Sequence, residues 1–436
     1  MLSLAKKIYK KLPSSISLPL LHVPFGFFCG PEYRRYLRLE EHAATCSLDE
    51  RIHICNKLLI SYVNESIKNV DYYRTVASEL GIDSISNIEL LKLFPVISKE
   101  DVQNNIELFT DKRFVRQRYL VSTGGTTGRQ LSFYLSNKCY AREWAFVNSF
   151  LKSKGINENS RRLCLRGVSG IAENKLIGYN YLYKEILVSP FKLNMATLAQ
   201  NIHLIKQFKP EFIHGYPSSV TEFAKLIIAL GIQINSLKHI LLVSEKVYPE
   251  QLEIITQAFG CEVITFYGMS ERVIFAGKNS DGFYPNLSYG LTEEIDGELV
   301  GTGFINEATR LIRYRTGDEA TVEKDDFIVT RISDIVGRWG SDALIGKSGI
   351  SITMTALNTH ADVFRDVNRY QFVQYLKGDC ELLVQSDALL SNTQLETIQR
   401  VFSAKVGDEL DIQVRQVKNI ELTSRGKHRF IVSHVK

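Results

Sequence analysis

Between Leu198 and Gly268 the sequence alternates regularly between helical and strand patterns. Apolar residues at helical spacing, Ile202, Ile205 and Phe208, precede a short apolar run, Phe212-Ile213-His214. The alternation continues with a helix over about 218–230, a strand over 239–244, a helix over 249–259 and a strand over 262–267. Strands separated by helices of this length pair in parallel, so this region predicts an α/β fold built on a parallel sheet.

Polar and glycine-containing segments follow three of these predicted strands. They are residues 214–218, 244–246 and 267–271. Ligands of open parallel sheets bind beyond the carboxyl ends of the strands. Each segment taken alone is an ordinary turn, whereas three of them at one sheet edge predict a ligand site.

A second feature is a run of seven residues that are all glycine or hydroxyl-bearing: Ser122, Thr123, Gly124, Gly125, Thr126, Thr127 and Gly128. It lies between an apolar run and an alternating run over 131–136, and so predicts a loop that joins two strands. Glycines allow close backbone approach, and hydroxyl and N–H groups bind anionic oxygens. A flexible hairpin connection is the alternative.

Neither this loop nor a second short motif matches the Walker phosphate loop. The first continues Gly128-Arg129-Gln130 and does not lead from a strand into a helix. The second, Gly346-Lys347-Ser348, has Ser341 where the Walker motif has its first glycine. The first is therefore interpreted as a different kind of nucleotide loop, and the second is set aside.

The length of 436 residues predicts two domains. Residues 1–336 are expected to form a large N-terminal domain, with a helical part over about 1–115, and residues 337–436 a small one. Within the large domain, residues 297–322 read as all-β, and the charged segment 313–318 reads as a turn, for which a plain surface loop is the alternative.

Composition excludes several classes of function. The formal charge is +5 without a long basic block, which argues against nucleic acid as a partner. Seven scattered cysteines without a Cys-x-x-Cys pair fit reduced thiols in the cytoplasm. An apolar patch over 16–28 is broken by prolines and too short to span a bilayer. It is interpreted as a packed or loosely ordered arm, with peripheral membrane contact as the alternative.

The order of these motifs resembles that of the adenylate-forming superfamily, which includes acyl-CoA synthetases and peptide-synthetase adenylation domains. The resemblance is closer to the phenylacetate-CoA ligase branch and to the CapK-type proteins of capsular polysaccharide biosynthesis. It spans most of the chain, from Ser122 to Lys427. It implies a large domain with parallel sheets and a β subdomain, plus a small, mobile α+β C-terminal domain that carries the catalytic lysine.

The resemblance also implies roles for individual residues. Residues 122–128 match the phosphate-binding loop, and Glu245 matches a glutamate near the adenine. In Tyr267-Gly268-Met269-Ser270-Glu271 the tyrosine would flank the adenine and the glutamate would help to hold Mg²⁺. Asp318 would bind the ribose hydroxyls, and Lys427 and Arg338 would be catalytic.

Two further residues, Tyr216 and Trp144, are expected to bind the substrate. Tyr216 belongs to the segment that resembles the branch's Gly-Tyr-Pro-Ser motif. Trp144 follows the phosphate loop in a helical stretch, 140–150, where a purely structural place in the core is the alternative.

The implied activity is ATP-dependent and Mg²⁺-dependent activation of a small carboxylic or amino acid as an acyl-adenylate, followed by transfer to CoA or another acceptor. The segment 338–342 lacks a match for the usual hinge residue, which leaves transfer to CoA open. Direct transfer to a sugar nucleotide, without CoA, is a second hypothesis. A nucleotide-binding protein that has lost catalysis is a third.

Overall fold

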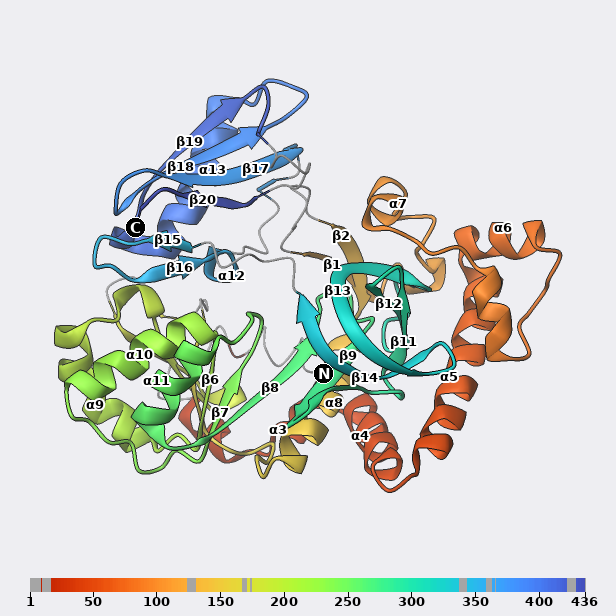
Figure 1. The fold of residues 1–436 in the computed structure, drawn as a ribbon, viewed down its shortest axis with the longest axis horizontal. Coiled ribbons are helices and arrows are strands. Elements are labelled where there is room, and N and C mark those ends of the chain that lie inside the picture. The colour runs from red at the N-terminus through yellow and green to blue at the C-terminus, as the bar shows by residue number, and fades with distance from the viewer. Residues whose placement is uncertain are drawn as a thin grey trace.

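The computed structural model describes residues 9, 17–123, 131–166, 171–172, 175–336, 343–357, 363–364, 366–421 and 429–435. These residues form a mixed α/β structure, which confirms the expected fold class. Helices from the first part of the chain lie at one end of a large sheet, and a smaller C-terminal unit lies above its other end (Figure 1).

The N-terminal part is helical. Its elements are η1 (Leu18–His22), α3 (Phe25–Cys29), α4 (Pro31–Ala43), α5 (Leu48–Asn69), α6 (Asp71–Glu79), η2 (Ile88–Leu93), α7 (Lys99–Asn104) and η3 (Lys112–Phe114). Helix α5 begins at a capping box in which Ser47 and Glu50 each accept a hydrogen bond from the other's backbone N–H. It buries one stripe, including Cys55, Leu59 and Val63, as its helical spacing predicts.

A hairpin and a helix connect this part to the sheet. Strands β1 (Arg118–Ser122) and β2 (Ser132–Ser136) pair antiparallel, with Ser122 opposite Ser132. The predicted loop therefore does join two strands. Helix α8 (Cys139–Ser153) follows and packs against β2 and α4.

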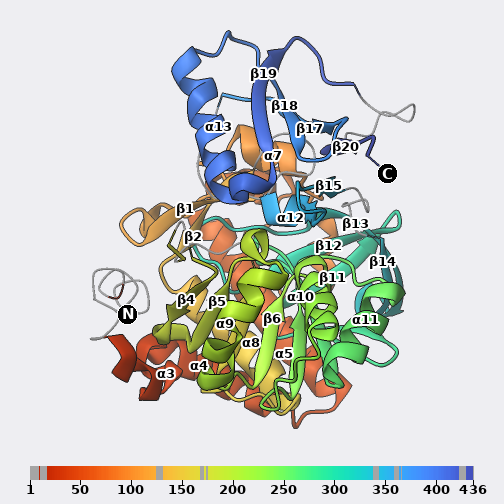
Figure 2. The same ribbon diagram turned by 90° about the vertical axis from the view of Figure 1, so that its left-hand side faces the viewer.

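The predicted helix–strand alternation is present, and its strands pair in parallel. The parallel strands are β3 (Arg162–Leu165), β5 (Glu185–Val188), β6 (Phe212–Gly215), β7 (His239–Leu242) and β8 (Glu262–Gly268). Helices α9 (Met195–Phe208), α10 (Pro217–Ala229) and α11 (Pro249–Phe259) cover one face (Figure 2). At the edge, β4 (Ile177–Asn180) pairs antiparallel with β5, and η4 (Tyr181–Tyr183) and η5 (Pro190–Lys192) flank β5 in sequence.

The parallel strands continue into an antiparallel region. Its strands are β9 (Phe275–Asn279), β10 (Gly282–Pro285), β11 (Gly290–Ile295), β12 (Glu298–Gly303), β13 (Tyr314–Asp325) and β14 (Ile328–Val336). Strand β8 pairs with β7 through residues 262–265 and with β9 through residues 266–268. Strands β3 to β14 thus form one twelve-stranded sheet, in which the predicted β region adjoins the parallel strands.

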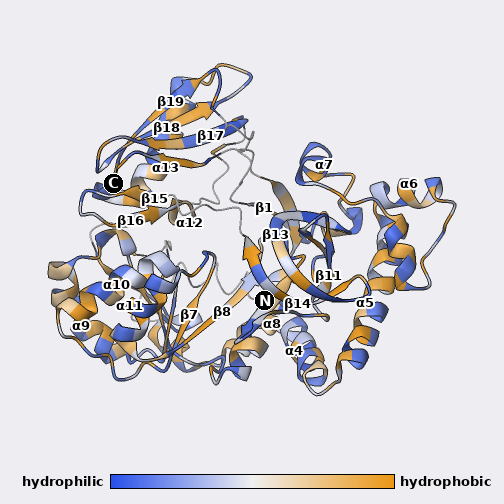
Figure 3. Cartoon of the chain, viewed as in Figure 1, coloured by the Kyte–Doolittle hydropathy of each residue, from blue (hydrophilic) through white to orange (hydrophobic). Residues whose placement is uncertain are grey.

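The C-terminal unit has its own sheet and core. Its elements are β15 (Ala343–Ile345), β16 (Ser351–Thr353), α12 (Met354–Leu357), β17 (Arg369–Gln374), β18 (Asp379–Gln385), α13 (Asn392–Val406), η6 (Gly407–Glu409), β19 (Asp411–Val417) and β20 (Ile431–Ser433). All the fully buried members of its apolar cluster lie between Leu344 and Ile431. In Figure 3 strand β8 is coloured largely as hydrophobic, whereas β13, which is mostly exposed or half-buried, is coloured largely as hydrophilic. The predicted domain boundary at 336/337 adjoins residues 337–342, which lie outside the described part.

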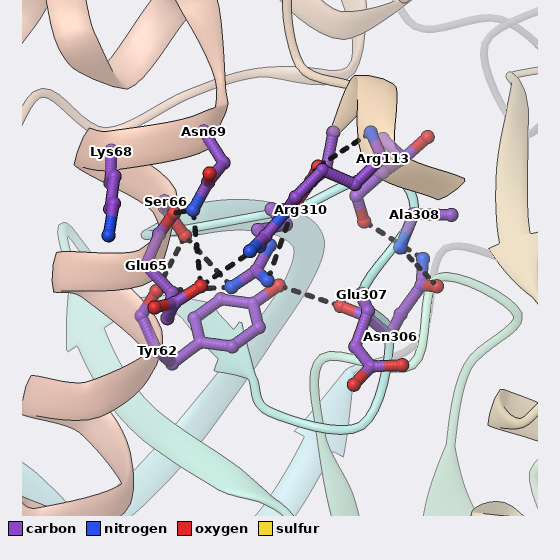
Figure 4. Close-up of polar contacts among 12 residues, drawn as sticks. Tyr62, Glu65, Ser66, Lys68, Asn69, Arg113, Asn306, Glu307, Ala308 and Arg310 are labelled. Carbon is purple, nitrogen blue, oxygen red and sulfur yellow. Dashed lines mark hydrogen bonds and ion pairs between the residues drawn. The ribbon is translucent and has the colours of Figure 1, made fainter. Parts of the chain in front are cut away.

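A buried polar network joins the N-terminal helices to the β region (Figure 4). The guanidinium of Arg310 lies 4.9 Å from the centre of the Tyr62 ring and donates to the Tyr62 carbonyl at 3.3 Å. The Tyr62 hydroxyl donates to the carbonyl of Asn306 at 3.0 Å. Asp111, whose side chain is 0% exposed, pairs with Arg310 at 3.5 Å and with Arg113 at 2.8 Å. Because these residues are far apart in sequence, the network fixes the helical layer on the sheet.

We predict that Asp111→Ala lowers the free energy of unfolding by about 3–5 kcal/mol, because it leaves the Arg310 guanidinium buried without its carboxylate. Urea unfolding of the purified protein measures this change. The control is Asp71→Ala, since Asp71 forms ion pairs with Arg74 and Lys112 at the surface. This control is expected to cost less than about 1 kcal/mol. Equal losses in the two variants would contradict the prediction.

Candidate functional site

The three polar segments predicted at strand ends follow neighbouring strands. Strands β6, β7 and β8 are adjacent and parallel, with His214 opposite Leu241 and Leu242 opposite Thr265. Their carboxyl ends therefore lie at the same edge of the sheet. The residues that follow include Tyr216, Glu245 and Ser270, which brings these candidates to that edge.

Glu245 is held by groups from two parts of the molecule. Its carboxylate accepts hydrogen bonds from the backbone N–H of Ser218 at 3.0 Å and from the Ser218 hydroxyl at 3.1 Å, at the first turn of α10. The hydroxyl of Thr353, in β16 of the C-terminal unit, donates to the same carboxylate. Burial raises the pKa of the Glu245 carboxyl, and the hydrogen bonds from Thr353 and Ser218 oppose that shift. Glu245 thus links the sheet edge to the C-terminal unit.

Tyr267 and Asp318 form a direct pair. The Tyr267 hydroxyl donates to Asp318 at 2.7 Å, although the two residues are 51 positions apart. Tyr267 lies in β8 near its carboxyl end, and Asp318 lies in β13. The two residues that the family resemblance assigns to adenine and ribose are therefore in contact.

The segment around Asp318 is not the turn that the sequence predicted. Residues 314–318 lie within β13, and the pairing of β13 with β12 is irregular there: Glu298 faces Glu319, but Val300 faces Arg315. The extra residues form a bulge with Gly317 in the left-handed region at φ 76°. The glycine and charged residues that suggested a turn lie in this bulge. The bulge places Asp318 against Tyr267.

Glu271 is buried, at 7% exposure, two residues beyond the end of the Tyr267-Gly268-Met269 run. The hydroxyl of Tyr314, itself fully buried, donates to it at 3.4 Å. The next residue, Arg272, pairs with Glu143 of α8 at 2.7 Å. Anchoring by Arg272 fixes the backbone that carries Glu271. In the same motif Gly268 is exposed and Ser270 is half-buried.

Glu271 could hold a magnesium ion only if the phosphate oxygens of a nucleotide supplied further ligands. Within the described ranges there is no cluster of three or more His, Cys, Asp or Glu residues that could hold a metal ion. Mg²⁺ is commonly bound through one or two carboxylates together with phosphate oxygens and waters. A single carboxylate beside a nucleotide site fits this type of coordination.

Several predicted site residues lie outside the described part of the chain. They are Gly124, Gly125, Thr126, Thr127, Gly128, Arg338 and Lys427. The described residues at the two ends of the predicted phosphate loop are hydrogen-bonded to each other. The Thr123 N–H donates to the Leu131 carbonyl at 2.9 Å, and the Leu131 N–H donates to the Thr123 hydroxyl at 3.3 Å. The Ser122 and Ser132 hydroxyls lie 3.0 Å apart.

The two predicted substrate-binding residues have different surroundings. Tyr216 immediately precedes α10 and is half-buried, and its N–H donates to the carbonyl of Leu165 at 3.1 Å. Trp144 lies among aromatic rings, 5.1 Å from Phe25 and 5.8 Å from Tyr183 between centroids. These contacts are those of a packed core residue, so a role for Trp144 in binding the acid stays a prediction.

In the motif Gly346-Lys347-Ser348, the groups that could bind a phosphate are paired with acidic side chains of the protein itself. Both the N–H and the hydroxyl of Ser348 donate to Glu409, at 3.0 and 2.9 Å. Lys347 pairs with Asp411 at 2.7 Å. Because these donors are already paired with acidic side chains, the structure agrees with setting this motif aside as a phosphate loop.

The sequence interpretation missed one polar cluster beside this edge. It consists of Arg162, Cys164 and Arg166 along β3 and the residue that follows it, with Glu185 on β5 and His214 on β6. The alternation of arginine with apolar residues along 162–166 is a strand signal that places these side chains on one face.

In the described part of the chain, no helix combines the length and the apolar character needed to cross a membrane.

Comparisons with known proteins identify relatives along nearly the whole chain. No protein-family model matches it. Protein CapK of Staphylococcus aureus is 24% identical over 451 residues, covering 98% of this chain and 99% of that protein. A phenylacetate-coenzyme A ligase of Pseudomonas putida is 26% identical over 368 residues, covering 77% of this chain and 81% of that protein.

A solved structure confirms the fold. The 2-hydroxyisobutyryl-CoA ligase in complex with 2-HIB-AMP and CoA has a TM-score of 0.54 with 16% identity, covering 89% of this chain and 90% of that one. Similarity to the two sequence relatives and the shared architecture agree with the order of motifs in this chain. The chain is therefore similar over nearly its whole length to protein CapK and over most of its length to phenylacetate-coenzyme A ligases, and it shares the fold of an acyl-CoA ligase that forms an adenylate.

Proposed function

We propose that this protein uses ATP to convert a small carboxylic acid into an acyl-adenylate with release of pyrophosphate, and then transfers the acyl group to CoA. The observation that carries the proposal is the contact between Tyr267 and Asp318 at the carboxyl end of β8. This contact brings together two residues that the family assigns to the nucleoside.

The residues at this edge suit a nucleotide. The Tyr267 ring offers an apolar face for a base, and the Asp318 carboxylate can accept hydrogen bonds from both ribose hydroxyls. Glu245, held by Ser218, would lie near the exocyclic amine of the adenine. The hydroxyls and N–H groups of residues 122–128 would bind the phosphates, and Ser270 and Gly268 would let the ligand approach the strand end.

The chemical problem is to bring two anions together, the acid and the α-phosphate. Lys427 would neutralise both as a mobile cation, and Arg338 would add charge-assisted hydrogen bonds. Glu271 would hold Mg²⁺ together with phosphate oxygens, and the ion would offset the charge of the pyrophosphate.

The acceptor is the less constrained part of the proposal. A structural neighbour binds an acyl-adenylate and CoA, which supports CoA as the acceptor here. The similarity to CapK supports a place for the product in surface polysaccharide synthesis. Because the reaction consumes ATP, we place it in the cytoplasm. Direct transfer to a sugar nucleotide is the second candidate.

We also propose that the residues from 337 onward form a mobile unit that completes the site. Lys427 and Asp318 belong to different units, so both can act on one ligand only when the units are together. The hydrogen bond from Thr353 to Glu245 supports a defined docking position for this unit at the nucleotide edge.

We predict that wild-type protein, incubated with ATP, Mg²⁺ and a pool of carboxylic and amino acids, yields an acyl-AMP detectable by mass spectrometry. Lys427→Ala is expected to lower its rate of formation about 10²–10³-fold, because one transition-state cation is lost. Lys418→Ala, an exposed lysine of the same unit, is the control and should not change the rate. ATP binding without any adenylate would favour the non-catalytic alternative.

Asp318→Asn should raise the KM for ATP by about 10- to 100-fold, because hydrogen bonds to a charged group contribute about 1.5–3 kcal/mol. Tyr267→Phe removes only the hydroxyl that contacts Asp318 and keeps the ring beside the base, so its effect on KM should be smaller. Steady-state pyrophosphate release measures both. A larger effect of Tyr267→Phe than of Asp318→Asn would contradict these roles.

Thr353→Val should loosen the C-terminal unit from the nucleotide edge while keeping the size of the side chain. We expect a larger radius of gyration in small-angle X-ray scattering. Ser218→Ala is the matched control, because it removes a hydrogen bond to the same carboxylate from within the large unit. An unchanged radius in Thr353→Val would argue against a docking role.

A further inference from the structure

The polar cluster beside the nucleotide edge lies on the α8 side of the sheet. Side chains alternate along β3, and Leu163 and Leu165 belong to the apolar cluster on the α9–α10 side. Arg162 and Cys164 therefore point to the opposite side, where the guanidinium of Arg162 lies 5.0 Å from the centre of the Trp144 ring of α8. Arg166 comes next, just past the carboxyl end of β3.

The cluster has more positive than negative charge. Glu185 pairs with Arg162 at 2.9 Å and lies 4.0 Å from Arg166, so one carboxylate serves two guanidinium groups. Its other oxygen accepts a hydrogen bond from Asn180 at 3.1 Å. Burial raises the pKa of the Cys164 thiol, which keeps it uncharged. No other anion of the described residues compensates Arg166 by an ion pair.

His214 adds no compensating charge either. It is buried, at 6% exposure, and burial and both arginines lower its pKa, so the ring is neutral at pH 7. In the described residues its Nδ1 has no hydrogen-bond partner. A neutral histidine with an unpaired ring nitrogen is a further polar group beside the arginines.

The guanidinium of Arg166 is accessible and has hydrogen-bond donors to offer a ligand. Its side chain is 30% exposed, and its Nε donates only a weak hydrogen bond, to the Cys164 sulfur at 3.5 Å. Neither terminal nitrogen makes a hydrogen bond within the part of the chain that the structure describes. A half-buried guanidinium with unused donors suits a carboxylate or another planar anion.

The position of Arg166 along the edge suggests which ligand. Tyr216, which follows β6, donates its N–H to the carbonyl of the last residue of β3. Burial raises the pKa of the Tyr216 hydroxyl, and the nearby charge of Arg166 opposes that shift. In the sheet, β6 lies between β3 and β7, and Glu245 follows β7. At about 4.8 Å per strand, Arg166 lies about 10 Å along the edge from the start of the nucleotide residues. A small acid activated at the nucleotide would extend its far end toward Arg166.

We propose that Arg166 is a specificity-determining residue that binds a second anionic group of the acid, so that the substrate class is a short dicarboxylic acid. This inference rests on the proposed function. One carboxylate would react with ATP, and the other would pair with Arg166 and stay unmodified.

The test compares short α,ω-dicarboxylic acids with their monoamides, which have the same length but a neutral far end. In wild type, acyl-AMP formation should favour the diacid. Arg166→Gln should lower kcat/KM for the diacid by about 10- to 100-fold, because a charge-assisted hydrogen bond to the second carboxylate is lost, and should change kcat/KM for the monoamide little. Arg166→Lys should restore part of the preference for the diacid.

The control variant is Arg161→Gln, which removes an arginine at the amino end of the same strand, where it donates to the Phe208 carbonyl at 3.1 Å. It should keep the preference for the diacid. Equal losses for diacid and monoamide in Arg166→Gln, or a wild-type preference for the monoamide, would overturn the inference and leave the proposed function standing.

The inference can also be judged if no acid is adenylated, a result that would count against the proposed function itself. Isothermal titration calorimetry with the same diacids and monoamides then measures binding directly. Tighter binding of the diacid to wild type than to Arg166→Gln would support the anion site. Equal binding of the diacid to both proteins would reject it.

Discussion

The structure depends on the double pairing of β8. Its first residues pair in parallel with β7, and its last residues pair antiparallel with β9. A strand can serve both partners because each edge of its backbone offers its own row of N–H and C=O groups. The consequence is that the carboxyl end of β8, where Tyr267 lies, is the junction between the α/β part and the β region. Asp318, from the β region, can therefore reach Tyr267.

Buried ion pairs hold the parts around this junction in place. Arg272 follows Glu271 and pairs with Glu143 of α8, while Arg313 precedes Tyr314 and pairs with Glu293 at 3.0 Å. Each pair is costly to bury and is stable only with good geometry and further hydrogen bonds. In both cases the arginine adjoins a residue of the Glu271–Tyr314 contact in sequence, and so the pairs orient the backbone of the candidate site.

The edge where we propose that the nucleotide binds and the arginine cluster share one sheet but differ in charge. At the proposed nucleotide end, Asp318, Glu245 and Glu271 provide hydrogen-bond acceptors. At the other end, Arg162 and Arg166 exceed Glu185 in charge. An edge with acceptors at one end and a cation at the other suits a ligand that carries its hydroxyls and its anionic groups at different ends. The docked Thr353 shows that the C-terminal unit can contact this edge from outside.

The sequence by itself determined the local elements and their class. The periodicity over 198–268 identified each helix and strand there, because apolar spacing reports which face of an element is buried. It also determined the order of the motifs, on which the resemblance to adenylate-forming ligases rests. It misread 314–318 as a turn, because glycine and charged residues signal a turn and a bulge alike.

Only the tertiary structure decided which distant residues meet. The contacts of Tyr267 with Asp318, of Glu245 with Thr353 and of Arg162 with Glu185 join segments that local patterns treat separately. Strand order and register set these contacts, and both depend on how the whole sheet is assembled. The excess of positive over negative charge around Arg166 likewise cannot be predicted from the sequence. It arises because Arg162 and Arg166 share the single carboxylate of Glu185 on a neighbouring strand.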